Sequence, residues 1–479
     1  MSGSIRAGVR EHGASILVSG LSAAFGVVLI GAVNVLATAV RQSQGGELVQ
    51  APLTTVSAIF FIISLYVGAI VTSNTFSTVI AGRTRQIALL RLIGATARQQ
   101  RRAVAAEGLR AGLVGALAGG AIGAALSLAS VPLLVGSGVL PDLRYQALSP
   151  AMLAPVVVVV FTTWFASWRG SRRIVTVSPI EALGVATQQG GDALPRRGLR
   201  LFLALAVLVV GTAAMAFGVA LPRMVPVDGP EAEIVMAAAI AVAFVGGLLS
   251  FSGVLMCARF FVPGLLGAAG RLLGRSAPAR LAAANATRHP ARSTRMTVGL
   301  VIGVTIVSGF QVAQTTFLDI LRDALSAEPD FYAAFTDIET TLTSLITVFS
   351  ILVGFSAVIA AVGLANNLSL SVVQRTRELG LLRALGFTRR QVRLMILAES
   401  TQITLTAVVI GLVLGIVYGW AAAQSLLGAI PGARLAPPAL PVAYLVLVVV
   451  MAALLAAAAA IAPTRRAVRV SPVEALSAA

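Results

Sequence analysis

Two acidic residues that interrupt long apolar stretches are the first candidates for chemistry in this sequence. Glu107 and Glu399 lie 292 positions apart, each about two turns into a stretch long enough to cross a membrane. A carboxylate within a bilayer is costly, and it either takes part in proton or ion transfer or pairs with a cation. No further acidic residues continue a path to the other side. We therefore favour pairing with a nearby arginine, such as Arg110 or Arg393, over an ion relay.

Two asparagines repeat at the same interval. Asn74 and Asn366 lie near the inner ends of two further apolar stretches. Amide side chains at such positions can hydrogen-bond across a helix bundle. We expect this structural role, and contact with a substrate is the weaker alternative.

Other kinds of chemistry are missing from the sequence. It has no lysine, so the phosphate-binding loop of an ATPase, which ends in Gly-Lys-Ser/Thr, is absent. The two histidines and the single Cys257 favour neither a hydrolase triad nor a metal site. We expect no catalytic residues, no metal ligands and no cofactor in this chain. Energy for any transport must then come from another polypeptide or from an ion gradient.

The composition indicates an integral membrane protein. Of 479 residues, 57% are hydrophobic and only 11% are charged, whereas soluble domains carry about 25% charged residues. The net charge of +18 would suggest nucleic-acid binding in a soluble protein. Here the arginines lie in specific connecting segments, where they set membrane orientation, so we expect no nucleic-acid partner.

We predict an all-α protein with ten membrane-spanning helices, since each needs about 20 apolar residues. Arginine is concentrated in alternate connecting segments and in the C-terminal tail. Because basic loops stay in the cytoplasm, both termini are expected to be cytoplasmic, in a multi-pass protein of the cell membrane. The predicted ranges are approximately 15–40, 53–80, 104–136, 150–168, 199–221, 232–257, 296–318, 340–370, 392–424 and 440–463.

One outer connecting segment is longer than the rest. Leu318–Thr340 contains six acidic residues and is expected to form a small helical cap. We favour a solvated acidic loop over a surface that attracts a cationic substrate.

The sequence is internally duplicated. The stretch Arg83–Glu107 returns without a gap as Arg375–Glu399, and Ser178–Leu183 (SPIEAL) returns as Ser471–Leu476 (SPVEAL). Both copies of the longer stretch follow helices that cross the membrane in the same direction, so the repeats are parallel. We divide the chain into a first four-helix repeat (1–185), a connector with an inserted helix pair (186–275) and a second four-helix repeat (276–479). The connector is expected to include an amphipathic surface helix, Leu265–Leu273.

Each copy of the repeated stretch predicts a short amphipathic helix, a break at a glycine and re-entry into the next membrane helix. An interfacial helix anchored by arginine would explain the charges, but not the same leucine and glycine positions in both halves. We therefore predict two matching docking surfaces for two identical cytoplasmic partners. The residues assigned to them are Arg83, Arg85, Leu89, Leu90, Arg91, Gly94, Arg375, Arg377, Glu378, Leu381, Leu382, Arg383 and Gly386.

The stretch RTRELGLLRALGFTRRQ and the closing RRAVRVSPVEAL resemble the permease domain of the FtsX/MacB-like ABC transporters. The inserted helix pair resembles the ten-span BceB-like permeases. The resemblance implies that the short helices are coupling helices seated on a separate cytoplasmic ATPase, in two copies that bind ATP and magnesium. The first copy departs from the pattern at Gln86 and Ala88, which suggests weaker docking there. The short outer segments also depart from it, because relatives have a large extracytoplasmic domain.

Our preferred interpretation is the permease of an ABC system that exports or extracts an amphipathic or hydrophobic substrate, such as a lipid, an antibiotic or an antimicrobial peptide. Few charged residues occur in the spans, so a strongly polar substrate would be poorly accommodated. The first alternative is a mechanical transmitter that moves no substrate. The second is an ion-coupled transporter, against which the parallel repeats count.

Overall fold

The computed structural model describes nine continuous stretches of the chain. They are residues 2–42, 93–136, 148–171, 195–224, 231–274, 276–288, 290–325, 376–427 and 435–469, with scattered positions at 58–70, 90, 144–146 and 350. Within these stretches all regular structure is helical, and no strand occurs. The described helices belong to two compact units, which we describe one at a time.

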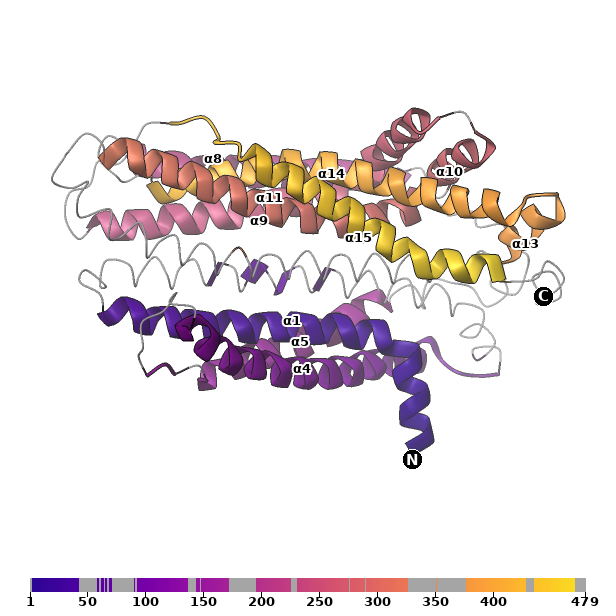
Figure 1. The fold of residues 1–479 in the computed structure, drawn as a ribbon, viewed down its shortest axis with the longest axis horizontal. Helices are drawn as coiled ribbons and strands as arrows, with labels where there is room; N and C mark the ends of the chain where they lie inside the picture. Colours follow the sequence, from indigo (N-terminus) through magenta and orange to yellow (C-terminus); the bar gives the residue numbers. More distant parts are fainter. Residues whose placement is uncertain are drawn as a thin grey trace. The chain divides into compact units, whose positions relative to one another are not determined.

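The first unit contains three long helices. The helices α1 (Ser2–Gln42), α4 (Ala97–Gly136) and α5 (Leu153–Gly170) pack on one another, and the short 3-10 turn η1 (Pro150–Met152) leads into α5 (Figure 1). Glycines of α4 allow α1 to approach closely: a Cβ atom on Gly123 would lie 2.8 Å from the carbonyl oxygen of Ala24. Small residues at such spacing are typical of membrane helix contacts. This confirms the close packing that the glycine-rich sequence of α4 predicts.

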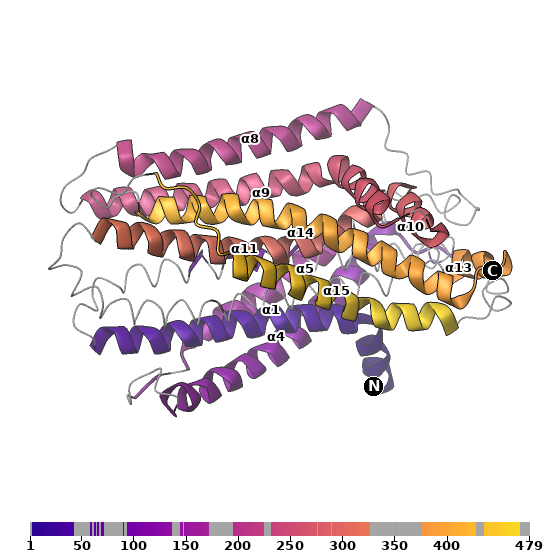
Figure 2. The ribbon, with the colours of Figure 1, turned by 45° about the horizontal axis from the view of Figure 1, so that its top comes forward.

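The second unit is organised around one long helix, α14 (Arg389–Leu427). It packs against α9 (Glu231–Leu272), α11 (Pro290–Leu325) and α15 (Val442–Arg469) (Figure 2). Three further helices complete the unit: α8 (Pro195–Met224), α10 (Ala277–Arg288) and α13 (Thr376–Ala384).

The inserted pair α8 and α9 packs on the helices of the second repeat. The Ser250 hydroxyl of α9 lies 3.0 Å from the Thr212 hydroxyl of α8 and 3.1 Å from the Tyr418 hydroxyl of α14. Phe251 meets the Tyr418 ring edge-on, with 5.9 Å between centroids. Met215, Val219 and Ala421 add a buried apolar contact at the same interface. The domain boundaries at 185/186 and 275/276 remain predictions.

The fold class predicted from sequence is confirmed: this is an all-α membrane protein. Seven described helices are long and apolar enough to cross a bilayer, and α15 contributes a shorter apolar run, Val442–Leu455. Together they match eight of the ten predicted spans. The predicted spans 53–80 and 340–370 lie outside the described residues, apart from scattered positions.

The prediction that Leu265–Leu273 forms a separate surface helix was wrong. α9 runs without interruption through Pro263 to Leu272. Val262, Leu266 and Ala269 are all buried, and their spacing keeps one face of a single helix against its neighbours. The separate short helix lies further along the chain and is α10.

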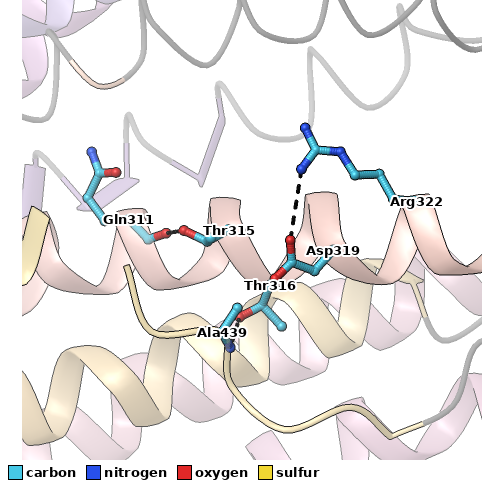
Figure 3. A network of polar contacts seen from close by, with 6 residues as sticks. All are labelled: Gln311, Thr315, Thr316, Asp319, Arg322 and Ala439. Atoms are coloured by element: carbon cyan, nitrogen blue, oxygen red, sulfur yellow. Dashed lines mark hydrogen bonds and ion pairs between the residues drawn. The ribbon is translucent and has the colours of Figure 1, made fainter. Parts of the chain in front are cut away.

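The predicted helix 296–318 is longer than expected. α11 continues to Leu325, so the start of the predicted cap Leu318–Thr340 belongs to that helix, and the rest lies outside the described residues. Figure 3 shows this end of α11, where Asp319 and Arg322 form an exposed ion pair at 4.0 Å. The Thr316 hydroxyl accepts a hydrogen bond from the Ala439 amide, 3.1 Å away, which fixes the segment that leads into α15.

Candidate functional site

The short helix α13 ends in a tight turn at Gly386. This glycine has φ +97°, and the Phe387 amide donates to the Leu382 carbonyl at 3.0 Å while the Gly386 amide donates to the Arg383 carbonyl at 3.1 Å. The two bonds form the Schellman motif, in which glycine is favoured because it adopts positive φ without a Cβ clash. The last carbonyls of α13 are therefore satisfied within the turn.

Helix α14 begins immediately after this turn with a capping box. The Thr388 amide donates to the Gln391 side-chain oxygen at 2.8 Å, and the Gln391 amide donates to the Thr388 hydroxyl at 3.2 Å. This reciprocal pair satisfies amides that would otherwise lack partners at a helix start. The direction of α13 relative to α14 is thus fixed by backbone hydrogen bonds at Gly386 and by side-chain caps on the amides that follow it.

The described part of the first copy, Leu90 and Ile93–Gln99, is held by corresponding hydrogen bonds. Gly94 has φ +109°, the Ala95 amide donates to the Leu90 carbonyl at 2.9 Å, and Thr96 and Gln99 form a capping box with distances of 2.9 and 3.2 Å. Each of these atoms has its counterpart 292 residues later. We call Leu90–Gln99 and Leu382–Gln391 the first and second elbows.

The predicted glycine break is therefore present in both copies, but the capping box was missed. Its signal was in the sequence, because Thr-x-x-Gln occurs at Thr96–Gln99 and again at Thr388–Gln391, each before an apolar run.

Apolar side chains project from both elbows. The residue before each glycine is highly exposed, Ile93 at 85% and Leu385 at 73%. Leu90 and Leu381 are also exposed, whereas Leu382 and Arg383 are half-buried. Large apolar side chains at the tip of a rigid, otherwise polar turn are typical of a protein contact surface.

The structure places part of the predicted docking set. Leu90, Gly94, Glu378, Leu381, Leu382, Arg383 and Gly386 lie on the elbows or on α13. Arg377 lies in α13, but its side chain is not described. The remaining members lie outside the described residues, as do Asn74 and Asn366; these members are Arg83, Arg85, Leu89, Arg91 and Arg375.

The two carboxylates lie above the elbows, on α4 and α14. Glu399 is only 7% exposed and Glu107 is half-buried, and neither side chain is isolated. Pairing with Arg110 or Arg393 stays a prediction. The first turns of α4 also contact α5, because the Arg101 guanidinium lies 5.2 Å from the centroid of the Trp168 ring.

The opposite end of α14 is held by a buried amide. The Gln424 side chain is fully buried; it accepts a hydrogen bond from the Arg223 guanidinium of α8 and donates one to the Ala436 carbonyl at 3.1 Å. The indole of Trp420 donates to the same carbonyl at 2.8 Å. Sequence reasoning assigned no role to Gln424, because its partners come from distant parts of the chain.

No group of three or more potential metal ligands occurs within the described part of the chain. What the described elements offer is mechanical: two rigid elbows with exposed apolar tips, each continuous with a helix long enough to cross the bilayer.

We expect the capping box to contribute measurably to elbow rigidity. Thr388→Ala should cost about 1 kcal/mol locally, because it leaves the Gln391 amide without its acceptor. Hydrogen exchange of the amides in the first turn of α14 should then be about five-fold faster. Thr401→Ala is the control, since the Thr401 hydroxyl is exposed and bonds only within α14. Equal exchange in the two variants would contradict the assignment.

Comparison with known proteins agrees with this geometry. The model of the family described as FtsX-like permease C-terminal matches residues 58–179 and again residues 350–472, together just over half of the chain. The two matches begin 292 residues apart, the interval that relates the elbows.

Individual relatives cover shorter stretches. The "Uncharacterized ABC transporter permease YknZ" of Bacillus subtilis is 36% identical over 85 residues, which are 18% of this chain and 21% of that protein. The "Macrolide export ATP-binding/permease protein MacB" of Bdellovibrio bacteriovorus is 31% identical over 118 residues, 22% of this chain and 18% of that protein. The chain spans about a fifth of the length of these curated relatives. On the strength of the duplicated family match, this chain belongs to the FtsX-like permease family.

Proposed function

We propose that this chain is the membrane subunit of an ABC transporter that exports or extracts an amphipathic or hydrophobic substrate. A separate cytoplasmic ATPase would drive it by pressing on the two elbows. The observation that carries the proposal is the shared hydrogen bonding of the elbows, in which a glycine turn and a capping box lead into a membrane helix in each half.

The length of the helices supports a lever. α14 has 39 residues and therefore measures about 58 Å, nearly twice the thickness of the hydrocarbon core of a bilayer, about 30 Å. Its first turns with their exposed Arg389, Arg390 and Arg393 would then project into the cytoplasm. A push on α13 would pass directly along α14, because the Schellman turn and capping box leave no free joint between them.

A separate motor is supported by the chain's own composition and by its relatives. The sequence has no lysine and thus no phosphate-binding loop. Relatives named ATP-binding/permease proteins combine the two activities in one longer chain. In this protein, two ATPase copies would carry the ATP and magnesium, one copy beneath each elbow, with both chain termini on the same cytoplasmic side in the cell membrane.

The surfaces of the membrane helices support an amphipathic or hydrophobic substrate. Their exposed side chains are mostly apolar, as on α8, where Phe202, Val209 and Phe217 are all exposed. A lipid, antibiotic or peptide with an apolar part could enter from the bilayer, whereas a strongly polar solute would find few partners. The macrolide in the name of one relative is an amphipathic compound of this general kind.

The second candidate is a transmitter that passes ATP-driven motion to another protein and moves no substrate. Arg223 and Gln424 favour it in one respect, because they fix the outer end of α14 to α8 and would deliver motion there. A substrate-stimulated ATPase assay in lipid separates the two candidates. Stimulation by amphipathic compounds favours transport, and no stimulation by any of them favours transmission.

The decisive variant is Leu381→Asp together with Leu385→Asp. Both side chains are exposed, so the fold should persist while a charge enters the apolar contact. We expect at least a ten-fold loss of ATPase stimulation and loss of co-purification with the ATPase. Leu381→Met with Leu385→Met is the matched control and should retain both. Undiminished stimulation in the aspartate variant would show that the second elbow is not the docking surface.

A further inference from the structure

A third turn of the chain shares the positive-φ glycine of the two elbows, although it lies outside the duplicated stretch. Gly274, between α9 and α10, has φ +106° and is the third positive-φ glycine of the described residues, after Gly94 and Gly386. Leu272, two residues before it, is 80% exposed. The Ser276 hydroxyl accepts a hydrogen bond from the Ala279 amide at 3.4 Å at the start of α10. We call residues 271–288 the basic elbow.

The basic elbow lies much closer to the bilayer than the second elbow does. A Cβ atom on Gly270 would be 2.9 Å from the side-chain nitrogen of Gln402, and α10 also packs on α14. Gln402 is 13 residues from the start of α14, which corresponds to about 20 Å along the helix. Taking Leu427, at the other end of α14, as the outer edge of a hydrocarbon core of about 30 Å, Gln402 lies at about 38 Å, near the opposite headgroup layer.

The surface at this level is strongly basic. Arg271, Arg280 and Arg288 are exposed, and the sequence contains no acidic residue between Glu233 and Asp319. One face of α10, with Ala279, Ala282 and Ala286, is buried against its neighbours, so Arg280 and Arg288 lie on its outward face, while Arg271 is exposed in the last turn of α9. Leu272 adds an apolar side chain beside them.

From this arrangement we propose that the basic elbow binds the headgroups of anionic phospholipids, with Leu272 in the adjoining apolar layer. Guanidinium groups form strong charge-assisted hydrogen bonds with phosphate, and each arginine near an anionic surface adds to the attraction. A docked ATPase is the less favourable occupant, because the second elbow extends about 20 Å further from the membrane. The inference depends on the depth of α14 and on charge, and not on the proposed transport function.

The depth of the basic elbow in the bilayer can be compared with that of the second elbow by two matched fluorescent probes. In full-length protein with Cys257→Ser, reconstituted in lipid nanodiscs, Leu272→Cys and Leu385→Cys are each labelled with bimane. Phosphatidylglycerol or phosphatidylcholine that carries a shallow doxyl group serves as the quencher. We expect strong quenching at position 272 and little at position 385, with at least two-fold stronger quenching at 272 by the anionic lipid.

The role of the arginines in lipid preference is tested with the same bimane probe at position 272. A triple variant should abolish the preference for phosphatidylglycerol; it combines Arg271→Gln, Arg280→Gln and Arg288→Gln. Each substitution should lower the affinity for the anionic lipid about five-fold at low salt. Arg389→Gln, Arg390→Gln and Arg393→Gln form a control of equal charge change at the start of α14, and they should leave the preference intact. Should the triple variant not fold, Arg288→Gln alone must reduce the preference.

Three results would overturn the proposal. They are an unquenched probe at position 272, equal quenching there by both lipids, and equal loss of preference in the two triple variants. ATPase co-purification is measured separately, so failure of lipid binding and failure of the proposed transport function remain distinguishable.

Discussion

Replacing Gly386 by valine is expected to lower ATPase-coupled activity by at least ten-fold. At φ +97° an L-amino acid with a branched Cβ is strained by about 1–2 kcal/mol or more, so the Schellman turn would open and α13 would lose its fixed direction. Nothing lies within 4 Å of the position that a Cβ would take, so the effect comes from backbone conformation alone and not from a clash. Coupled ATPase activity in lipid is the measurement.

Two variants sharpen this test. Gly264→Val places the same side chain in equally open space on α9, where the glycine lacks positive φ, and should behave like the unmodified protein. Gly386→Asn should retain much of the activity, because asparagine tolerates the left-handed region. If valine at positions 264 and 386 had the same effect, the turn geometry would not matter for coupling.

Gly94→Val allows the two halves to be compared. Its Ala95 amide donates to the Leu90 carbonyl, as Phe387 does to Leu382, and the space around its missing Cβ is also open. The sequence of the first copy departs from the family pattern at Gln86 and Ala88, so we expect a smaller loss than at Gly386.

The largest effect on stability is expected for Gly415→Leu. A Cβ atom there would lie 2.9 Å from the Gly309 amide nitrogen and 3.0 Å from the Ser308 Cβ, so α11 and α14 would have to separate. Overpacking of this kind costs about 1–3 kcal/mol, and here it affects the contact around which the second unit is organised. The thermal midpoint in detergent should fall by several degrees, or the chain should not fold.

A smaller substitution keeps that prediction testable if the leucine variant fails to fold. Gly415→Ala should be destabilising alone and partly rescued by Ser308→Gly, because the Ser308 side chain is among the nearest obstacles. Gly264→Leu is the control for the substitution itself, since no atom lies within 4 Å of a Cβ atom at that position. Equal midpoints for the leucine variants at 264 and 415 would contradict close packing of the two helices.

The two tests address different properties of glycine in one protein. At Gly386 the missing side chain permits a backbone conformation, whereas at Gly415 it permits two helices to approach. The first should change coupling with little change in stability, and the second should change stability first.

The sequence by itself determined the class of protein and the symmetry of its design. Composition and apolar segment length predicted membrane helices, because a helix of about twenty apolar residues is long enough to span the hydrocarbon core whatever its neighbours are. The gapless repeat predicted two equivalent turns, since a glycine after an amphipathic stretch acts through local hydrogen bonds. The Thr-x-x-Gln signal of the capping box is equally local, but the prediction did not use it. Both turns formed as the local pattern requires.

Only the tertiary structure decided which distant residues meet. Gln424 binds Arg223 across 201 positions, and Gly270 lies against Gln402, because helices from separate parts of the chain bury their faces together. Burial of Val262, Leu266 and Ala269 likewise keeps α9 helical through Pro263 to Leu272, where the local sequence suggested a separate surface helix. Contacts of this kind depend on which helix lies beside which, and no short stretch of sequence contains that information.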